Sequence, residues 1–172
     1  IEEVVVDAPI EDVDALRLGG PEPHGRRSGV VHVVAETTAA AYEEARRLAA
    51  LLGDQGTLNL SAVTDVNLAG YLPESARRAY DVHGLVEHLL DDDSMLELHP
   101  KWAPNIVTSL GRLGGRTVGG IANNPLRSGG CLDSSSAEKA ARFVRMCDAF
   151  GVPLVVLVDG PGYLPGVGQE WD

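Results

Sequence analysis

The chain has 172 residues, of which 44% are hydrophobic and 23% charged, so it is long enough to bury the core of one ordinary domain. Its 25 acidic residues outnumber its 14 Lys and Arg residues, which gives a net charge of -11 and a pI near 4.8. That excess of negative charge disfavours nonspecific binding to nucleic acid or to anionic lipid.

The first third of the sequence predicts two short strands and one helix. Val-rich residues 4–6 and 30–35 have the composition of strands, and a Gly-Pro-His loop lies between them. Thr37 or Thr38 suits the N-cap of a helix whose apolar residues recur at helical spacing up to Gly53. Polar, aperiodic residues then have the composition of a linker. We therefore expect a first unit at 1–53, a linker at 54–78 and a second unit at 79–172.

The second unit begins with a predicted helix and a predicted hairpin. Residues 80–93 place Val and Leu on one helical face, and the acidic run at their end marks the exit from the helix. Two apolar segments, 105–113 and 116–124, flank Gly114 and Gly115. A Gly-Gly pair suits the tight turn of a hairpin, so the two segments are predicted to be adjacent strands.

Residues 134–151 give the clearest helical signal of the chain. Ser135 and Glu138 are predicted to form a capping box, and Gly151 to end the helix. The run VPLVVLVDG that follows is typical of a strand buried on both faces of a parallel sheet, so strand, helix and strand predict a right-handed crossover unit. The apolar face of the helix is predicted to consist of Ala137, Ala141, Val144 and Phe150.

Two Gly- and Pro-rich segments are the candidate site loops. NNPLRSGGCLD joins the hairpin to the capped helix, and DGPGYLPG follows the last strand. Ligands of α/β proteins bind at loops that follow the carboxyl ends of strands. Gly162 lets a ligand approach the backbone closely, and the amides of Gly162, Tyr163 and Leu164 could stabilise a developing negative charge. The alternative is a rigid turn that binds nothing.

Other kinds of site find little support in the sequence. There is no G-x-S-x-G nucleophile elbow, no phosphate-binding GxxxxGK[ST] and no CxxC or HExxH motif, and no metal site is predicted. His83 and His88 lie five residues apart, which does not suit a helical metal pair, so both are predicted to face solvent. Arg142 and Arg145 lie three apart and either contact a phosphate or face solvent.

A few further expectations concern the whole chain. No apolar run is long enough to span a bilayer and the start is acidic, so a cytoplasmic location is predicted. Cys131 and Cys147 are expected to be buried free thiols, and Trp102 and Trp171 core or interface anchors. The sequence begins without Met and stops shortly after a Gly-Pro-rich turn, so we expect both ends to be cut from a longer protein.

Several segments together closely resemble the carboxyltransferase subunit of biotin-dependent acyl-CoA carboxylases, the acetyl-/propionyl-CoA carboxylase beta chain. They are GRRSGVVHVV, RRAYDVHGLVEHLLDDD, WAPNIV and the continuous stretch 110–171, which includes SAEKAARFVRMCDAF and VDGPGYLPGVGQEW. The resemblance extends from about residue 11 to residue 171. It implies an α/β, crotonase-like fold, of which this chain holds the end of the first half and the start of the second.

The resemblance also implies a function. Such a ligase of fatty acid biosynthesis transfers the carboxyl group of carboxybiotin, carried by a partner protein, to the α-carbon of acetyl-CoA or propionyl-CoA, giving malonyl-CoA or methylmalonyl-CoA. The implied ligands are biotin and acyl-CoA. The implied partners are a biotin carboxyl carrier or biotin carboxylase subunit and further copies of the chain in a hexameric ring of dimers. A decarboxylase or transcarboxylase subunit is one alternative, and a noncatalytic assembly module is another.

The site implied by the resemblance is built from backbone. The amides of Gly162, Tyr163 and Leu164 would act beside the biotin pocket. The family's Gly-Gly and Gly-Ala peptides, which cradle the thioester and biotin, fall outside these residues, so the chain alone is expected to be inactive. Gly160 stands where the family usually has Val and is expected to loosen the end of the strand. The residues expected to contact substrate are Asn124, Gly129, Gly130, Pro161 and Gly166.

Overall fold

The predicted hairpin forms the centre of the structure. A computed structural model describes residues 14–75 and 77–171. In it, β2 (Ile106–Leu113) and β3 (Arg116–Asn123) pair antiparallel along their whole length. The turn between them uses Gly114 at φ 56° and Gly115 at φ 83°, the left-handed region that the Gly-Gly pair was predicted to supply.

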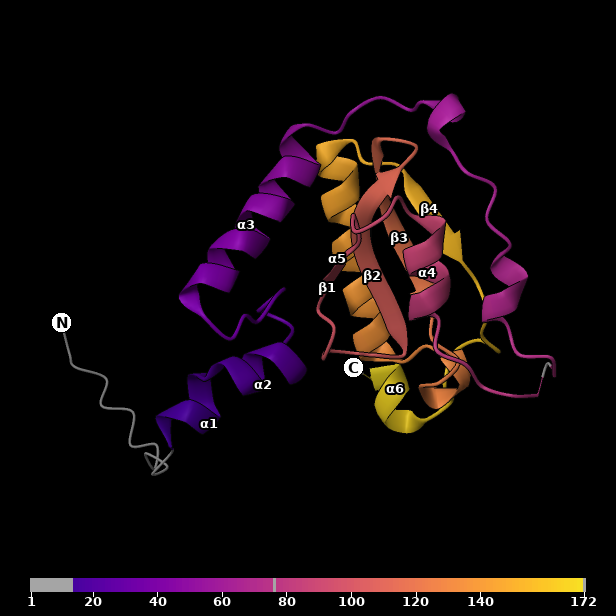
Figure 1. Ribbon diagram of the computed structural model, residues 1–172. Coiled ribbons are helices and arrows are strands. Elements are labelled where there is room, and N and C mark those ends of the chain that lie inside the picture. The colour runs from indigo at the N-terminus through magenta and orange to yellow at the C-terminus, as the bar shows by residue number, and fades with distance from the viewer. Residues whose placement is uncertain (1–13, 76, 172) are drawn as a thin grey trace, which may run out of the picture.

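Two outer strands complete a four-stranded sheet in the order β1-β2-β3-β4 (Figure 1). β1 (Leu96–Leu98) pairs antiparallel with β2, and β4 (Leu154–Leu157) pairs parallel with β3. The helix α5 (Ser134–Phe150) connects the parallel pair. The predicted strand-helix-strand unit is therefore present, with its parallel pairing.

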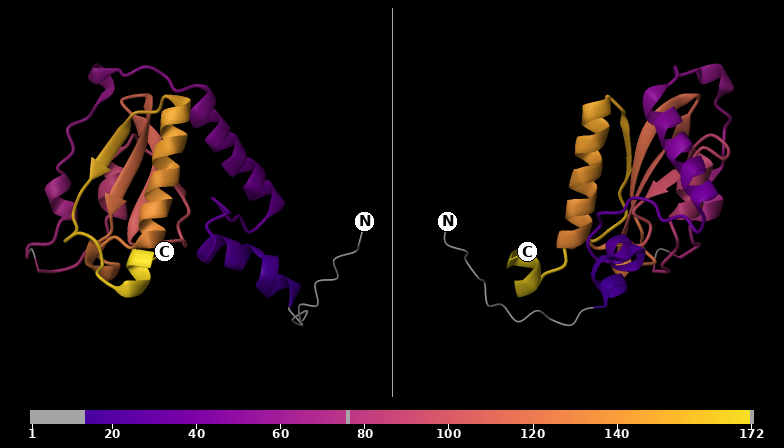
Figure 2. Two further views of the ribbon diagram at one scale, coloured as in Figure 1. Left: turned by 180° about the vertical axis from the view of Figure 1, so that it is seen from behind. Right: turned by 90° about the vertical axis from the view of Figure 1, so that its left-hand side faces the viewer.

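Helices cover both faces of the sheet, as the two views of Figure 2 show. On one face, Phe143 and Cys147 of α5 and Leu51 of α3 (Thr38–Gly53) pack with residues of all three antiparallel strands. On the other face, the helix α4 (His83–Leu89) packs against β2 and β3. Its contacts are made by Val86, within the helix, and by Val82, the residue before it. A mixed sheet between helical layers agrees with the α/β, crotonase-like fold that the resemblance implies.

The first part of the described chain differs from its prediction. Where a Gly-Pro-His loop was expected, the structure has the short helices α1 (Ala15–Gly19) and α2 (Pro21–Arg26). The predicted strand at 30–35 is wrong, because these residues have no strand partner within 14–75 and 77–171, where only the carbonyl of His32 among them accepts an amide, that of His99, at 2.7 Å. The strand predicted at 4–6 lies outside the described residues.

The helix α3 matches its prediction: Thr37 caps it, accepting a hydrogen bond from the amide of Ala40, and it ends at Gly53. The residues that follow contain two short 3-10 turns, η1 (Leu60–Ala62) and η2 (Leu68–Tyr71). This segment contacts the turn between β2 and β3, where Asn59 donates its backbone amide to the Gly114 carbonyl at 2.8 Å. The division into two units joined by a linker at 54–78 stays a prediction.

The helix α5 has the predicted length, but its cap and its buried face were predicted wrongly. Asp133 is the N-cap and forms the capping box with Ser136, in place of the pair Ser135 and Glu138. The left-handed Gly151 ends the helix, as expected. The residues buried against the sheet are Ser136, Lys139, Phe143 and Cys147, while Ala141, Val144 and Phe150 of the predicted face are exposed.

Lys139 explains this rotation of the helix. Its side chain is fully buried, and its ammonium donates to the backbone carbonyls of the turn before β2, at distances of 2.7 to 3.4 Å. Burial lowers the pKa of Lys139 to about 8. A buried ammonium is tolerated only when its donors are satisfied, and carbonyl oxygens satisfy them here. The four acceptors belong to His99, Trp102, Ala103 and Ile106.

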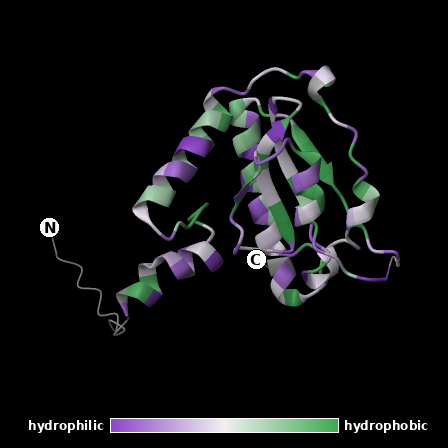
Figure 3. Cartoon of the chain, in the orientation of Figure 1, coloured by the Kyte–Doolittle hydropathy of each residue, from purple (hydrophilic) through white to green (hydrophobic). Residues whose placement is uncertain are grey.

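The strand β4 is hydrophobic along its length (Figure 3) but is not buried on both faces. Val155 and Leu157 pack on the α4 side of the sheet, whereas Val156 is 54% exposed and Val158, just after the strand, is 80% exposed. The prediction of burial on both faces is wrong because β4 is an edge strand of the described sheet.

Some single-residue expectations are met within the described residues. Cys131 and Cys147 are free thiols, the first half-buried and the second buried, and Trp102 is buried at 3% exposure. Among the described residues, no helix combines the length and the apolar character that crossing a membrane requires. The side chain of Trp171, in the final helix α6 (Val167–Trp171), lies outside the description.

Candidate functional site

The two predicted site loops meet beyond the carboxyl ends of the parallel strands β3 and β4. Leu132 and Tyr163 form an isolated parallel bridge between them. The amide of Leu132 donates to the Gly162 carbonyl at 2.9 Å, and the amide of Leu164 donates to the Leu132 carbonyl at 2.8 Å. The end of a parallel strand pair is where α/β proteins bind ligands, so the loops lie where a site was expected.

The loops also touch at two glycines. Gly130 has φ 76°, and a Cβ atom added to it would lie 2.4 Å from the carbonyl oxygen of Asp159. A Cβ atom added to Gly160 would lie 2.4 Å from the carbonyl oxygen of Gly130. Only hydrogen fits at these two positions, so Gly160 permits close packing between the loops.

Side-chain hydrogen bonds reinforce this contact. Asn123 donates its side-chain amide to the Gly130 carbonyl at 2.8 Å and accepts the Asp159 amide at 3.3 Å. The Tyr80 hydroxyl donates to the Asp159 carboxylate at 2.8 Å. Burial, together with this carboxylate, raises the pKa of Tyr80 to about 12, so the phenol remains a donor at neutral pH. Sequence reasoning assigned no role to Tyr80 or Asp159, and no local pattern signals a pair 79 residues apart.

Asn124 builds the first loop from within. It is 2% exposed, its side-chain oxygen accepts the Leu126 amide at 3.2 Å, and its side-chain amide donates to Asp81 at 3.3 Å. Both polar ends of the side chain therefore already have partners in the protein. Asn124 shapes the loop that a substrate would meet.

The same network holds His83, which is a correction to the expectation that it faces solvent. Its ring is half-buried, with Nδ1 on Asp81 and Nε2 3.2 Å from Glu97. The hydrogen bonds to Glu97 and then Asp81 raise the pKa of His83 to about 9, so it is an imidazolium at neutral pH. His88 does lie exposed, stacked on Tyr71.

Of the three backbone amides predicted to act at the site, that of Leu164 already has a hydrogen-bond acceptor, and those of Gly162 and Tyr163 have none among the described residues. The Leu164 amide is bonded to Leu132, as described above. Within residues 14–75 and 77–171, no protein acceptor receives the amide of Gly162 or Tyr163. Because consecutive residues of a strand direct their amides to opposite sides, the Tyr163 amide lies on the side away from Leu132.

The other predicted contact residues are accessible. Pro161, Gly166 and Gly129 are exposed, and apart from the adjacent residues no described residue has a heavy atom within 4 Å of a Cβ built on Gly129 or Gly162. An open cavity of about 690 Å³ adjoins the first loop, between Leu126 and the end of α2. In the described part of the chain, no group of three or more His, Cys, Asp or Glu side chains is placed to hold a metal ion.

The comparison with protein families decides what kind of protein carries these loops. The model of the carboxyl transferase domain matches residues 3–172. The chain belongs to the carboxyl transferase family. The crotonase-like fold that the resemblance implied is thereby confirmed.

Relatives of this chain are known in bacteria. It is 57% identical over 172 residues to the biotin-dependent acetyl-/propionyl-coenzyme A carboxylase beta6 subunit of Mycobacterium tuberculosis, covering 98% of this chain and 36% of that subunit. It is 52% identical over 176 residues to the propionyl-CoA carboxylase beta chain of Rhodococcus erythropolis, covering 99% of this chain and 37% of the relative. The chain thus spans little more than a third of the length of these relatives.

A solved structure shares the fold. The transcarboxylase 12S hexamer, crystallised with hydrolysed methylmalonyl-coenzyme A, superposes with a TM-score of 0.85 at 39% identity, over 94% of this chain and 33% of that one.

Proposed function

We propose that this chain forms the biotin-facing part of a carboxyltransferase that transfers a carboxyl group from carboxybiotin to the α-carbon of acetyl-CoA or propionyl-CoA. The observation that carries the proposal is the pair of Gly-rich loops joined by Leu132 and Tyr163, which leaves the Tyr163 amide without an acceptor among the described residues. The names of the relatives support it, since one is a biotin-dependent acetyl-/propionyl-coenzyme A carboxylase subunit and the other a propionyl-CoA carboxylase beta chain.

The residues present fit a biotin ring. When bound, carboxybiotin supplies the carboxyl group, and its ring carbonyl is an acceptor that suits preorganised amide donors. The Tyr163 amide would hold that oxygen, and the paired Leu164 amide would fix the loop. Because Gly162 has φ 121° and no heavy atom within 4 Å of its added Cβ, its backbone can lie against a planar ring.

The wider setting is part of the same proposal. The biotin would be carried by a carrier protein or biotin carboxylase subunit, and copies of the chain would assemble as a ring of dimers. The hexamer of the transcarboxylase 12S structure supports this arrangement. A cytoplasmic location and a part in fatty acid biosynthesis stay predictions.

A chimera tests the function. The matched segment of the Mycobacterium tuberculosis subunit would be replaced by this chain, and carboxylation of acetyl-CoA and propionyl-CoA measured with the carrier and biotin carboxylase subunits present. We expect turnover by the chimera and none by the 172-residue chain alone. A chimera that assembles like the parent but transfers no carboxyl group would refute the proposal and favour a noncatalytic assembly module.

Two substitutions in the chimera address the amide. Tyr163→Pro removes the N–H donor, and we expect kcat to fall about 100-fold, the usual loss of one oxyanion-type donor. Tyr163→Phe keeps the amide and is the matched control, since the Tyr163 ring is exposed. Equal activity in both variants would show that the amide has no part in the reaction.

The second candidate is a transcarboxylase subunit, which passes the carboxyl group from a carboxylated acyl-CoA to another acceptor. The likeness to the transcarboxylase 12S structure favours it. Measuring carboxyl transfer from methylmalonyl-CoA to a keto acid by the same chimera, with the transcarboxylase's own biotin carrier, distinguishes this direction from ATP-dependent carboxylation.

A further inference from the structure

The open cavity beside the first loop brings together arginines from distant parts of the sequence. Arg26 and Arg27, at the end of α2, line one wall, and Arg127 lines another beside Ser128. The cavity has a volume of about 690 Å³ and reaches Ser135 in the first turn of α5. Residues about 100 positions apart thus form one concave, polar surface.

The cavity is a local positive region on a strongly negative chain. Against three arginines, its lining includes one acid, Asp133, while the chain as a whole carries a net charge of -11. The Asp133 carboxylate is engaged in capping α5, accepting the Ser136 amide at 2.8 Å. Although burial opposes it, that bond and its neighbours lower the pKa of Asp133. One negative charge therefore remains in the wall, held against the helix.

The arginines differ in their availability. Arg26 forms an ion pair with Glu22 one turn earlier. Within the described ranges 14–75 and 77–171, neither Arg27 nor Arg127 has a carboxylate partner or donates a side-chain hydrogen bond. Two guanidinium groups are thus free of described partners at the rim of one cavity.

We propose that this cavity binds the phosphoryl group of a phosphorylated organic ligand, with Arg27 and Arg127 as its main contacts. Planar guanidinium groups can donate paired hydrogen bonds to the oxygens of a phosphate, and the two negative charges of a phosphate dianion balance the positive charges of the two arginines. The hydroxyls of Ser128 and Ser135 add donors to the same walls, and the positive end of the α5 dipole has the favourable sign. Leu126, 49% exposed at the rim, offers an apolar surface to the organic part.

The phosphoryl group could come from coenzyme A or from a free phosphorylated compound, and the experiment separates the two. Binding of inorganic phosphate, adenosine 3′,5′-bisphosphate and coenzyme A to the 172-residue chain would be measured by calorimetry at fixed ionic strength. Arg27→Ala and Arg127→Ala are the test variants, and Arg127→Lys keeps the charge but loses the fork.

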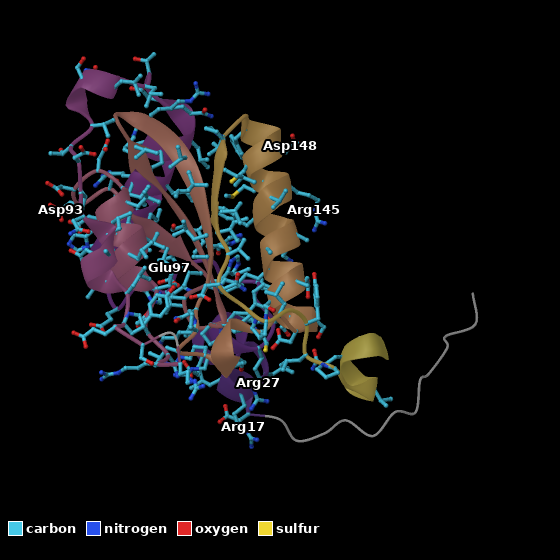
Figure 4. The ribbon with its side chains drawn as sticks, turned by 90° about the vertical axis from the view of Figure 1, so that its right-hand side faces the viewer. Arg17, Arg27, Asp93, Glu97, Arg145 and Asp148 are labelled. Atoms are coloured by element: carbon cyan, nitrogen blue, oxygen red, sulfur yellow. The ribbon has the colours of Figure 1, made fainter. Side chains whose placement is uncertain are left out.

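Arg145 supplies the matched control. In Figure 4 it lies along α5, well away from Arg27 at the foot of the sheet, and it lines no part of the cavity. Arg145→Ala changes the net charge of the chain as the test variants do. Thermal unfolding and near-UV circular dichroism of each variant would show that it remains folded.

We expect saturable binding of adenosine 3′,5′-bisphosphate, at least tenfold weaker in Arg27→Ala and in Arg127→Ala, and changed less than twofold in Arg145→Ala. Arg127→Lys should fall between the wild type and Arg127→Ala. Tighter binding of coenzyme A than of the bisphosphate, lost in the same variants, would assign the cofactor as the source, and equal or weaker binding would assign a free phosphorylated compound.

Three results would overturn the proposal: no saturable binding of any of the three probes, binding retained in both alanine variants, or the same loss in Arg145→Ala, which would reflect net charge alone. Because these measurements follow binding by the chain itself, their failure is distinct from a failure of carboxyl transfer in the chimera.

Discussion

Gly130 offers a sharp test of whether the two loops are held by direct backbone contact. It has φ 76°, and a Cβ atom there would lie 2.4 Å from the Asp159 carbonyl oxygen. Its neighbour Gly129 has a similar φ of 62°, with nothing within 4 Å of its added Cβ. Alanine at either position therefore adopts an unfavourable backbone conformation, but only Gly130→Ala also produces a steric clash.

The two costs can be estimated separately. A left-handed backbone costs an L-residue about 1 to 2 kcal/mol, so Gly129→Ala should lower the free energy of unfolding by about 1 kcal/mol. Gly130→Ala must in addition move the facing carbonyl by about 1 Å to restore an ordinary contact, and such overpacking costs about 1 to 3 kcal/mol. We expect a total loss of about 2 to 4 kcal/mol for Gly130→Ala.

Urea unfolding followed by circular dichroism measures these losses, and hydrogen exchange shows where they arise. The Leu132 and Leu164 amides, which bond across the two loops, should exchange faster in Gly130→Ala than in Gly129→Ala. If the two variants lost the same stability and protected these amides equally, the loops could not be in the contact described.

Three further predictions concern buried groups. Lys139→Met removes the ammonium from four backbone carbonyls, of which, among the described residues, only those of His99 and Ala103 also accept a backbone amide outside the strand ladder, and should lower the free energy of unfolding by about 3 kcal/mol, as measured in urea. Wild-type stability in this variant would contradict the role of the ammonium. Because the pKa of His83 is raised to about 9, its charged form stabilises the fold below pH 6.5, and stability should decline as the pH rises through 9. His83→Gln should flatten that decline, and an unchanged profile would exclude His83 as its origin. Burial raises the pKa of Cys147 to about 11, so a thiol reagent should label Cys131 first in the native chain. Mass spectrometry of the labelled peptides measures the order, and labelling of Cys147 first would contradict the prediction.

The elements that the sequence predicted well depend on local signals. The Gly114–Gly115 turn fixes the hairpin, Thr37 and Gly53 bound α3, and Gly151 ends α5 in the left-handed conformation. Each of these features is decided by the residue itself and by neighbours within one turn. No distant partner is needed to predict them.

Features that depend on distant partners were missed. The periodicity of α5 selected Val144 and Phe150 as core residues, but the carbonyls of the turn at 99–106 draw Lys139 inward and rotate the helix. In the same way, residues 30–35 have the composition of a strand, yet no strand in the described part of the chain pairs with them. A hydrophobic pattern predicts which residues can be buried, but it does not predict which other segment they will pack against.

The candidate site shows the same division. Its loops were predictable from Gly and Pro content and from their place after strands. Which amides remain available was not, because the Leu164 amide is bonded to a residue 32 positions earlier in the chain, Leu132. The arginine cavity was also hidden, since the sequence separates Arg27 from Arg127 and gives no sign that α2 lies beside the loop.

Because Gly130 and Gly160 are in contact, the size of the residue that fits at one position depends on the residue at the other. Since a side chain at Gly160 would meet the Gly130 carbonyl at 2.4 Å, a family member with Val at this place must hold its loops farther apart. A wider spacing carries the Tyr163 amide outward with the second loop. A side chain at residue 160 would thereby change both the spacing of the two loops and the position of the Tyr163 amide.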